Sequence, residues 1–179
     1  MNIKNEALFK NGTENLEKFI SDYTRPIISI KKNPNKDDVN EEINAYRSKY
    51  PEKNKITSQS GRTWILIGRK GKKIYSLNVG QSIDIFKEIE LIIGTIINKK
   101  GPYYELSNRY TELLFYEILN DEYIKRSLDL DEEQLRNLAY ELTKDYLAEY
   151  LVAKNTAAKH WNYYGSGMDK RYYFHFDIK

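Results

Sequence analysis

A glutamate on the apolar face of a predicted helix is the residue in this sequence best placed to do chemistry. Residues 131–155 begin with three acidic side chains, which favour a helix start because they meet the positive end of the helix dipole. Apolar residues then recur at the spacing of one helix face: Leu135, Leu138, Leu142, Tyr146 and Ala153. Glu149 falls on nearly the same face. A carboxylate there is costly unless it meets a cation, a metal ion or several hydrogen-bond donors, so the residues leave both an ordinary ion pair and a ligand site open.

Two polar side chains, His160 and Asn162, follow this helix. An asparagine after a helix is usually a turn residue, so Asn162 gains meaning only together with other residues. His175 is the only other histidine, which excludes a histidine-rich metal site. The chain has no cysteine, which excludes disulfides, thiolate nucleophiles and cysteine metal sites.

The densest cluster of positive charge lies in a short segment around Gly71 and consists of Arg69, Lys70, Lys72 and Lys73. The net charge of the chain is only +3, so basic residues matter where they cluster. Four cations at a turn suit contacts with nucleic-acid phosphates. Solvated lysines are also common at hairpin tips, and the sequence leaves both interpretations open.

This basic segment separates two apolar runs, and the pattern predicts a β-hairpin over residues 63–82. The first run, 64–67, has no polar alternation, which is typical of a strand covered on both faces. The second run contains Tyr75 and closes at Gly80, and a glycine-bearing connection of this length favours a hairpin. Ser82 is predicted to cap a following helix over 83–99, and residues 109–119 are predicted to form a third strand.

The first 60 residues are polar and rich in turn formers. Helices are predicted over 13–23, with Thr13 as the cap, and over 37–50, with a short strand at 27–30 between them; the tail, 171–178, resembles a strand. The fold class predicted is α+β, with a small, mainly antiparallel three-stranded sheet flanked by helices. Residues 1–60 are predicted to be an N-terminal helical extension of a main domain over 61–179. The extension is either a solvated cap or an added nucleic-acid contact surface.

The segments NVGQSIDI (78–85) and LAEYLVAKNTAAKHWN (147–162) together resemble the GIY-YIG nuclease superfamily. The resemblance covers residues 62–164. It implies a three-stranded antiparallel sheet flanked by helices and a metal-dependent attack on DNA. It also implies a metal-binding glutamate on a late helix and an asparagine after it, which match Glu149 and Asn162.

The sequence departs from the family pattern at its tyrosines and its arginine. The first tyrosine position falls near Trp64 or Ile65, and the second falls on Asn78. Tyr75, three residues before Asn78, lies on the opposite face if the strand is regular. The helix arginine aligns with Glu88, which leaves Lys87 as the adjacent cation.

The resemblance therefore implies a substituted catalytic set. Glu149 would bind one Mg²⁺, and Tyr75 or His160 would orient or deprotonate the attacking water. Lys87 would stabilise the charge of the pentacovalent phosphate, although without the bidentate fork of an arginine.

The function predicted from these residues is a divergent metal-dependent endonuclease that hydrolyses DNA, from a restriction or mobile-element system. Two alternatives stay open: a catalytically inactive GIY-YIG-like module that binds nucleic acid, and a small interaction or inhibitor protein whose basic hairpin meets an acidic partner. No small-molecule cofactor is expected. No apolar run approaches the ~18 residues that a membrane span needs, and the N-terminus lacks an apolar segment of signal-peptide length, so a cytoplasmic location is predicted.

Overall fold

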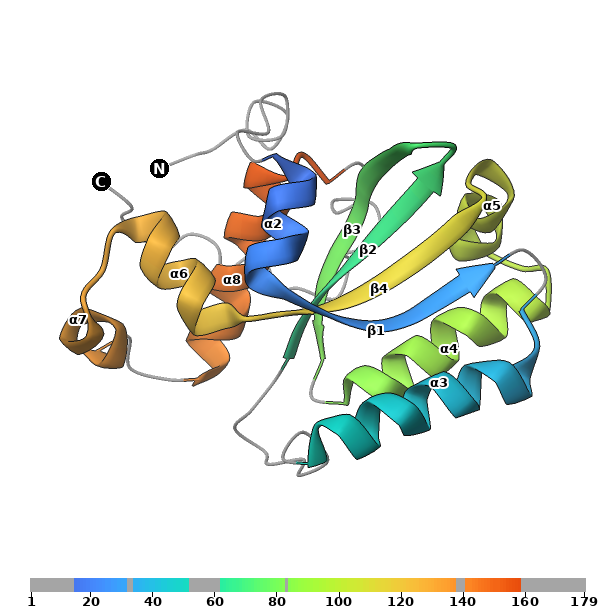
Figure 1. Ribbon diagram of the computed structural model, residues 1–179, viewed down its shortest axis with the longest axis horizontal. Helices are drawn as coiled ribbons and strands as arrows, with labels where there is room; N and C mark the ends of the chain where they lie inside the picture. Colours follow the sequence, from blue (N-terminus) through green and yellow to red (C-terminus); the bar gives the residue numbers. More distant parts are fainter. Residues whose placement is uncertain (1–14, 32–33, 52–61, 83, 138–140, 159–179) are drawn as a thin grey trace.

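Four antiparallel strands form one open sheet at the centre of the computed structural model, which describes residues 15–31, 34–51, 62–82, 84–137 and 141–158. The strands are β1 (Thr24–Lys31), β2 (Arg62–Lys70), β3 (Lys73–Ser82) and β4 (Glu112–Ile118), and their order across the sheet is β1-β4-β2-β3 (Figure 1). The predicted α+β class with an antiparallel sheet is confirmed, with four strands in the described chain where three were predicted.

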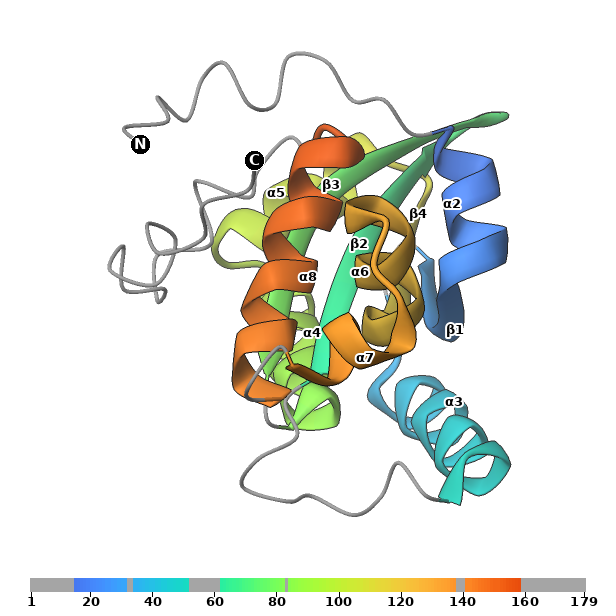
Figure 2. The ribbon, with the colours of Figure 1, turned by 90° about the vertical axis from the view of Figure 1, so that its left-hand side faces the viewer.

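Helices cover both faces of this sheet, as the views in Figures 1 and 2 show. One face packs against α3 (Lys36–Lys49), α4 (Ile85–Ile97) and α5 (Pro102–Arg109), and the other against α2 (Leu16–Tyr23), α6 (Asn120–Leu128), α7 (Glu132–Asn137) and α8 (Glu141–Asn155). We call these the α3–α5 face and the α8 face. Strand β2 supplies both cores, because Trp64 and Leu66 enter the first and Ile65 and Ile67 the second. This is why its sequence shows no polar alternation.

The predicted hairpin joins β2 to β3, with Lys70 paired to Lys73 across a turn that contains Gly71. Gly71 has a φ of 61°, a left-handed conformation that glycine adopts at little cost. The register shifts at Leu77, so that Leu66 pairs with Asn78 and Ile67 with Ser76. One extra residue in β3 therefore forms a β-bulge, which changes the faces that the flanking side chains occupy.

Helix α4 begins with a different cap from the one that the sequence predicts. The carboxylate of Asp84 accepts a hydrogen bond from the Lys87 backbone N–H at 3.1 Å, so Asp84 is the N-cap. The hydroxyl of Ser82 instead accepts a bond from the Asp84 backbone N–H at 3.2 Å. The prediction of Ser82 as the cap was wrong because the turn after β3 takes two more residues than the glycine signal indicates.

Two elements of the predicted N-terminal extension belong to this sheet and its core. Strand β1 pairs antiparallel with β4, from Thr24 opposite Ile118 to Lys31 opposite Glu112, and α3 packs on β1. Pro26 is tolerated there because β1 is an edge strand, and the register is irregular at that point.

Other predicted elements are recovered with shifted ends. Helix α2 begins after Asn15, whose side chain caps it, whereas the predicted cap Thr13 lies outside the described residues. The predicted helix 131–155 corresponds to α7 and α8, and residues 138–140 between them are outside the description, as is the predicted strand 171–178. None of the helices in the described ranges has the length and apolar character needed to cross a bilayer.

Candidate functional site

Glu149 lies inside the layer between α8 and the hairpin, with 1% of its surface exposed. Contacts at both ends of α8 fix the helix along β2 and β3. The Thr63 hydroxyl donates to the backbone carbonyl of Asp145 at 3.2 Å, and the hydroxyls of Ser76 and Thr156 lie 2.8 Å apart. Glu149 is between these contacts, one helical turn after Asp145. The carboxylate therefore belongs to the packed side of α8.

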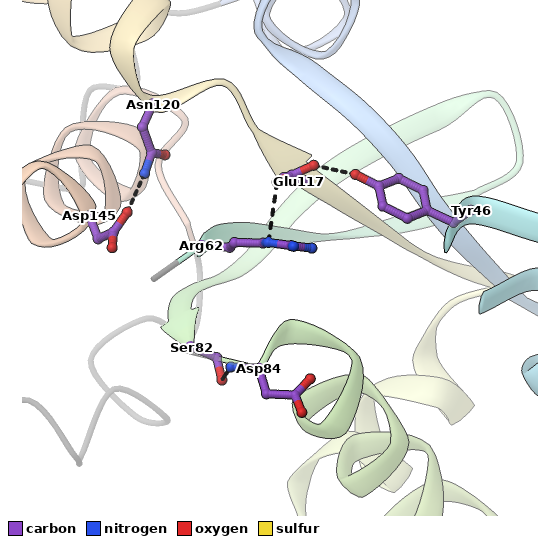
Figure 3. A network of polar contacts seen from close by, with 7 residues as sticks. All are labelled: Tyr46, Arg62, Ser82, Asp84, Glu117, Asn120 and Asp145. Carbon is purple, nitrogen blue, oxygen red and sulfur yellow. Dashed lines mark hydrogen bonds and ion pairs between the residues drawn. The ribbon is translucent and has the colours of Figure 1, made fainter. Parts of the chain in front are cut away.

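A second carboxylate accompanies Glu149 on this side of the helix. Asp145 is 2% exposed, and its Oδ1 accepts a hydrogen bond from the Asn120 side-chain amide at 2.6 Å (Figure 3). Sequence reasoning missed Asp145, although its spacing of four residues from Glu149 on one helix was a usable signal. The tertiary contact with Asn120 had no such signal.

The donor chemistry of this pair suits a metal ion that the protein binds with only some of its ligands. Carboxylate oxygens are the ligands that Mg²⁺ prefers, and Mg²⁺ is commonly held by one or two carboxylates together with waters and substrate phosphates. Within the described ranges there is no group of three or more His, Cys, Asp or Glu side chains suited to a metal ion. Glu149 and Asp145 have the oxygen-donor chemistry that Mg²⁺ binds.

A separate buried network lies on the α3–α5 face at the same end of the sheet (Figure 3). Glu117 of β4 is 3% exposed; its Oε2 accepts a hydrogen bond from the Tyr46 hydroxyl, and its Oε1 lies 3.9 Å from Nε of Arg62. Burial, reinforced by the negative charge of Glu117, raises the pKa of Tyr46 well above its ordinary value. This network joins α3, β2 and β4, and no local pattern predicts it because its members are far apart in the chain.

The structure does not bring Tyr75 or Lys87 to Glu149. Tyr75 packs on the α3–α5 face, where its ring centroid is 5.8 Å from that of Tyr110, whereas α8 covers the opposite face. Lys87 is exposed in the first turn of α4, also on the α3–α5 face. His160 and Asn162 lie outside the described residues.

Two of the three motif positions that depart from the family pattern, Asn78 and Glu88, have structural surroundings of their own. Asn78 donates from Nδ2 to the Tyr103 hydroxyl at 3.1 Å and accepts through Oδ1 from the Val79 backbone N–H at 3.0 Å. The bulge at Leu77 thus puts Asn78 on the same face as Tyr75, where a regular strand would separate them. Burial raises the pKa of Glu88, which occupies the arginine position.

The four predicted phosphate-binding cations are together and exposed at the hairpin tip. Arg69 is the most constrained of them, since its Nη1 lies 2.5 Å from Oε2 of Glu112. Glu112 also accepts a hydrogen bond from the Ser29 hydroxyl. The three lysines around Gly71 therefore supply most of the positive charge that this tip presents to solvent.

A scan against protein-family models and comparisons with curated proteins and with solved structures find no match for this chain.

Proposed function

We propose that the protein is a metal-dependent endonuclease that hydrolyses DNA phosphodiester bonds, of the kind used by restriction or mobile-element systems. The observation that carries the proposal is the position of Glu149, 1% exposed on the hairpin side of α8. Burying a carboxylate is unfavourable for stability, and unfavourable buried charges concentrate at functional sites. A second buried carboxylate one turn away, Asp145, supports the assignment.

The order of the elements also supports the proposal. The resemblance to GIY-YIG nucleases implies a hairpin, a following helix, a third strand and a later helix with the metal-binding glutamate. Here the hairpin β2–β3 is followed by α4, β4 lies beside β2, and α8 carries Glu149 over β2 and β3. The fourth strand, β1, adds to the edge of this arrangement beyond β4.

In the proposed reaction each role falls to a named side chain. Glu149 holds the metal ion, which when bound neutralises charge on the scissile phosphate. Asp145, held by Asn120, orients this turn of α8. The hairpin-tip lysines bind the DNA backbone, His160 takes the proton of the attacking water, and Asn162 stabilises the charged transition state.

Plasmid cleavage tests the proposal. The wild-type protein is expected to nick supercoiled plasmid with Mg²⁺ and not with EDTA, and Glu149→Gln should lower the rate by about 100-fold or more. Glu133→Gln, at an exposed position of α7, is the matched control and should cleave like the wild type. Circular dichroism should show that both variants fold. Cleavage by the Glu149→Gln variant at the wild-type rate would refute the proposal.

A non-catalytic DNA-binding module is the second candidate, and one observation favours it. Asn78, at a tyrosine position of the family, is engaged in structural hydrogen bonds, and Tyr75 packs on the face away from α8. This candidate predicts salt-dependent binding of duplex DNA with no Mg²⁺-dependent cleavage, so the same plasmid assay separates the two.

A further inference from the structure

Basic and aromatic side chains gather around the C-terminal end of α3, at the end of the sheet opposite the hairpin tip. We propose that Arg25, Arg47 and Lys49 form there a second phosphate-binding surface for duplex DNA, which we call the α3 surface. The inference rests on the proposed function in taking DNA as the ligand. It gives part of the predicted extension, residues 1–60, a role in binding it.

Two aromatic rings organise these cations. Arg25 Cζ lies 5.1 Å and Lys49 Nζ 5.3 Å from the centroid of the Tyr50 ring. Arg47 Cζ lies 4.4 Å from the centroid of the Phe86 ring. The Tyr46 ring connects both, with centroids 4.9 Å from Tyr50 and 5.8 Å from Phe86. Residues from β1, α3 and α4 thus place three positive charges on one continuous aromatic patch.

The charge beneath this patch is already balanced. Arg62 also lies over Phe86, with Cζ 5.4 Å from the ring centroid, and its side chain is only 12% exposed. It faces Glu117, which is 3% exposed, so that pair contributes little net charge to the surface. Asp84 and Glu88 lie nearby on α4, and the Asp84 carboxylate is used to cap that helix. Arg25, Arg47 and Lys49 outnumber the two carboxylates of α4 by one, so the rim keeps a net positive charge; Arg25 and Arg47 are half-buried and Lys49 is exposed.

The arrangement suits phosphates. A guanidinium stacked on a ring keeps a fixed plane, and its edge has the fork of N–H donors that matches phosphate oxygens. The α3 surface is also well separated from the hairpin tip. Arg62, which lies over Phe86 beside the α3 surface, begins β2, and Lys70 at the hairpin tip ends it. The eight residue steps from Arg62 to Lys70, at about 3.3 Å each, separate the two surfaces by roughly 26 Å, which is the length of about eight base pairs of duplex. Contacts at both ends of the sheet would fix the position and direction of a duplex on the protein.

DNA binding measured against salt concentration tests the α3 surface. The probe is a fluorescein-labelled 24-bp duplex without Mg²⁺, and the test variant is R47E/K49E. The control is R126E/R136E, which makes the same net charge change on the α8 face. Arg126 matches Arg47 closely: it lies 5.6 Å from the Tyr23 ring centroid, in the last turn of α6. Arg136 is in the last turn of α7, as Lys49 is in that of α3.

The expected result is a selective loss. For R47E/K49E the slope of log K against log salt should become shallower by about 2, and the affinity at 100 mM salt should fall by about tenfold or more. R126E/R136E should stay within about twofold of the wild type. R47Q/K49Q removes the two charges without reversing them, and it should show most of the slope change. This variant keeps the test valid if charge reversal disturbs folding.

Three results would overturn the inference: an unchanged slope in both α3 variants, an equal loss in the control, or no salt-dependent DNA binding by the wild type. Its failure is distinguishable from that of the proposed function. Selective loss of binding in a protein that does not cleave would support the α3 surface and refute the nuclease. Cleavage by a protein whose α3 variants bind normally would do the reverse.

Discussion

Replacing Tyr46 with phenylalanine should reveal how much the buried network of Tyr46, Glu117 and Arg62 stabilises the fold. Tyr46 is 4% exposed and donates its hydroxyl hydrogen to Glu117, which is 3% exposed. A hydrogen bond to a charged group contributes about 1.5–3 kcal/mol, and its loss leaves the buried carboxylate with one donor fewer. We expect a decrease in the free energy of unfolding of about 2 kcal/mol at pH 7, or about 4–8 °C in Tm for a chain of this length.

The same substitution should change how stability depends on pH. Burial, and then the charge of Glu117, raise the pKa of Tyr46 above the ordinary tyrosine value of 10.0. As the pH rises, the unfolded chain therefore releases the Tyr46 hydroxyl proton at a lower pH than the folded chain does. The stabilisation is complete below the unfolded pKa and is lost as the pH rises above it, at about 1.4 kcal/mol per pH unit for one proton. Above pH 10 the wild type should lose stability faster than the Tyr46→Phe variant, by about that slope.

Urea denaturation between pH 7 and 11, followed by tryptophan fluorescence, measures both effects. Burial also raises the pKa of Tyr110, Tyr116 and Tyr150, but these residues are common to both proteins, so the difference isolates Tyr46. Tyr50→Phe is the matched control, because Tyr50 is half-buried beside Tyr46. Equal stability of wild type and Tyr46→Phe at pH 7, or parallel losses above pH 10, would refute the reasoning.

Two further substitutions test packing and burial, both by urea denaturation. A Cβ added at Gly80 would lie 2.5 Å from Cζ2 of the buried Trp64, so Gly80→Ala should destabilise the protein by about 1–3 kcal/mol, and an unchanged midpoint would contradict this. Burial raises the pKa of Glu88, so its contribution to stability is present below the unfolded pKa and lost as the pH rises. Glu88→Gln should therefore be more stable than the wild type at pH 7 and lose this advantage near pH 4; a difference independent of pH would count against the burial of Glu88.

Much of the secondary structure could be predicted because its signals are local. Two apolar runs around Gly71 are enough to specify the hairpin, and the isoleucine spacing after Ser82 is enough to specify α4. The burial of Glu149 also followed from periodicity, since one helix face is buried as a unit. The basic hairpin tip was equally readable, because a tight turn keeps its neighbours together.

Only the tertiary structure decided which side chains share a face and which elements share a sheet. A one-residue bulge at Leu77 puts Tyr75 and Asn78 on the same face, away from Glu149, and no local pattern indicates such a shift. The pairing of β1 with β4 and the meeting of Tyr46 with Glu117 join segments more than 70 positions apart. The sequence by itself therefore determined the elements and their buried faces, because those depend on neighbours along the chain. Strand register and helix docking decided which residues make up each site, because both depend on contacts between segments that are far apart in the chain.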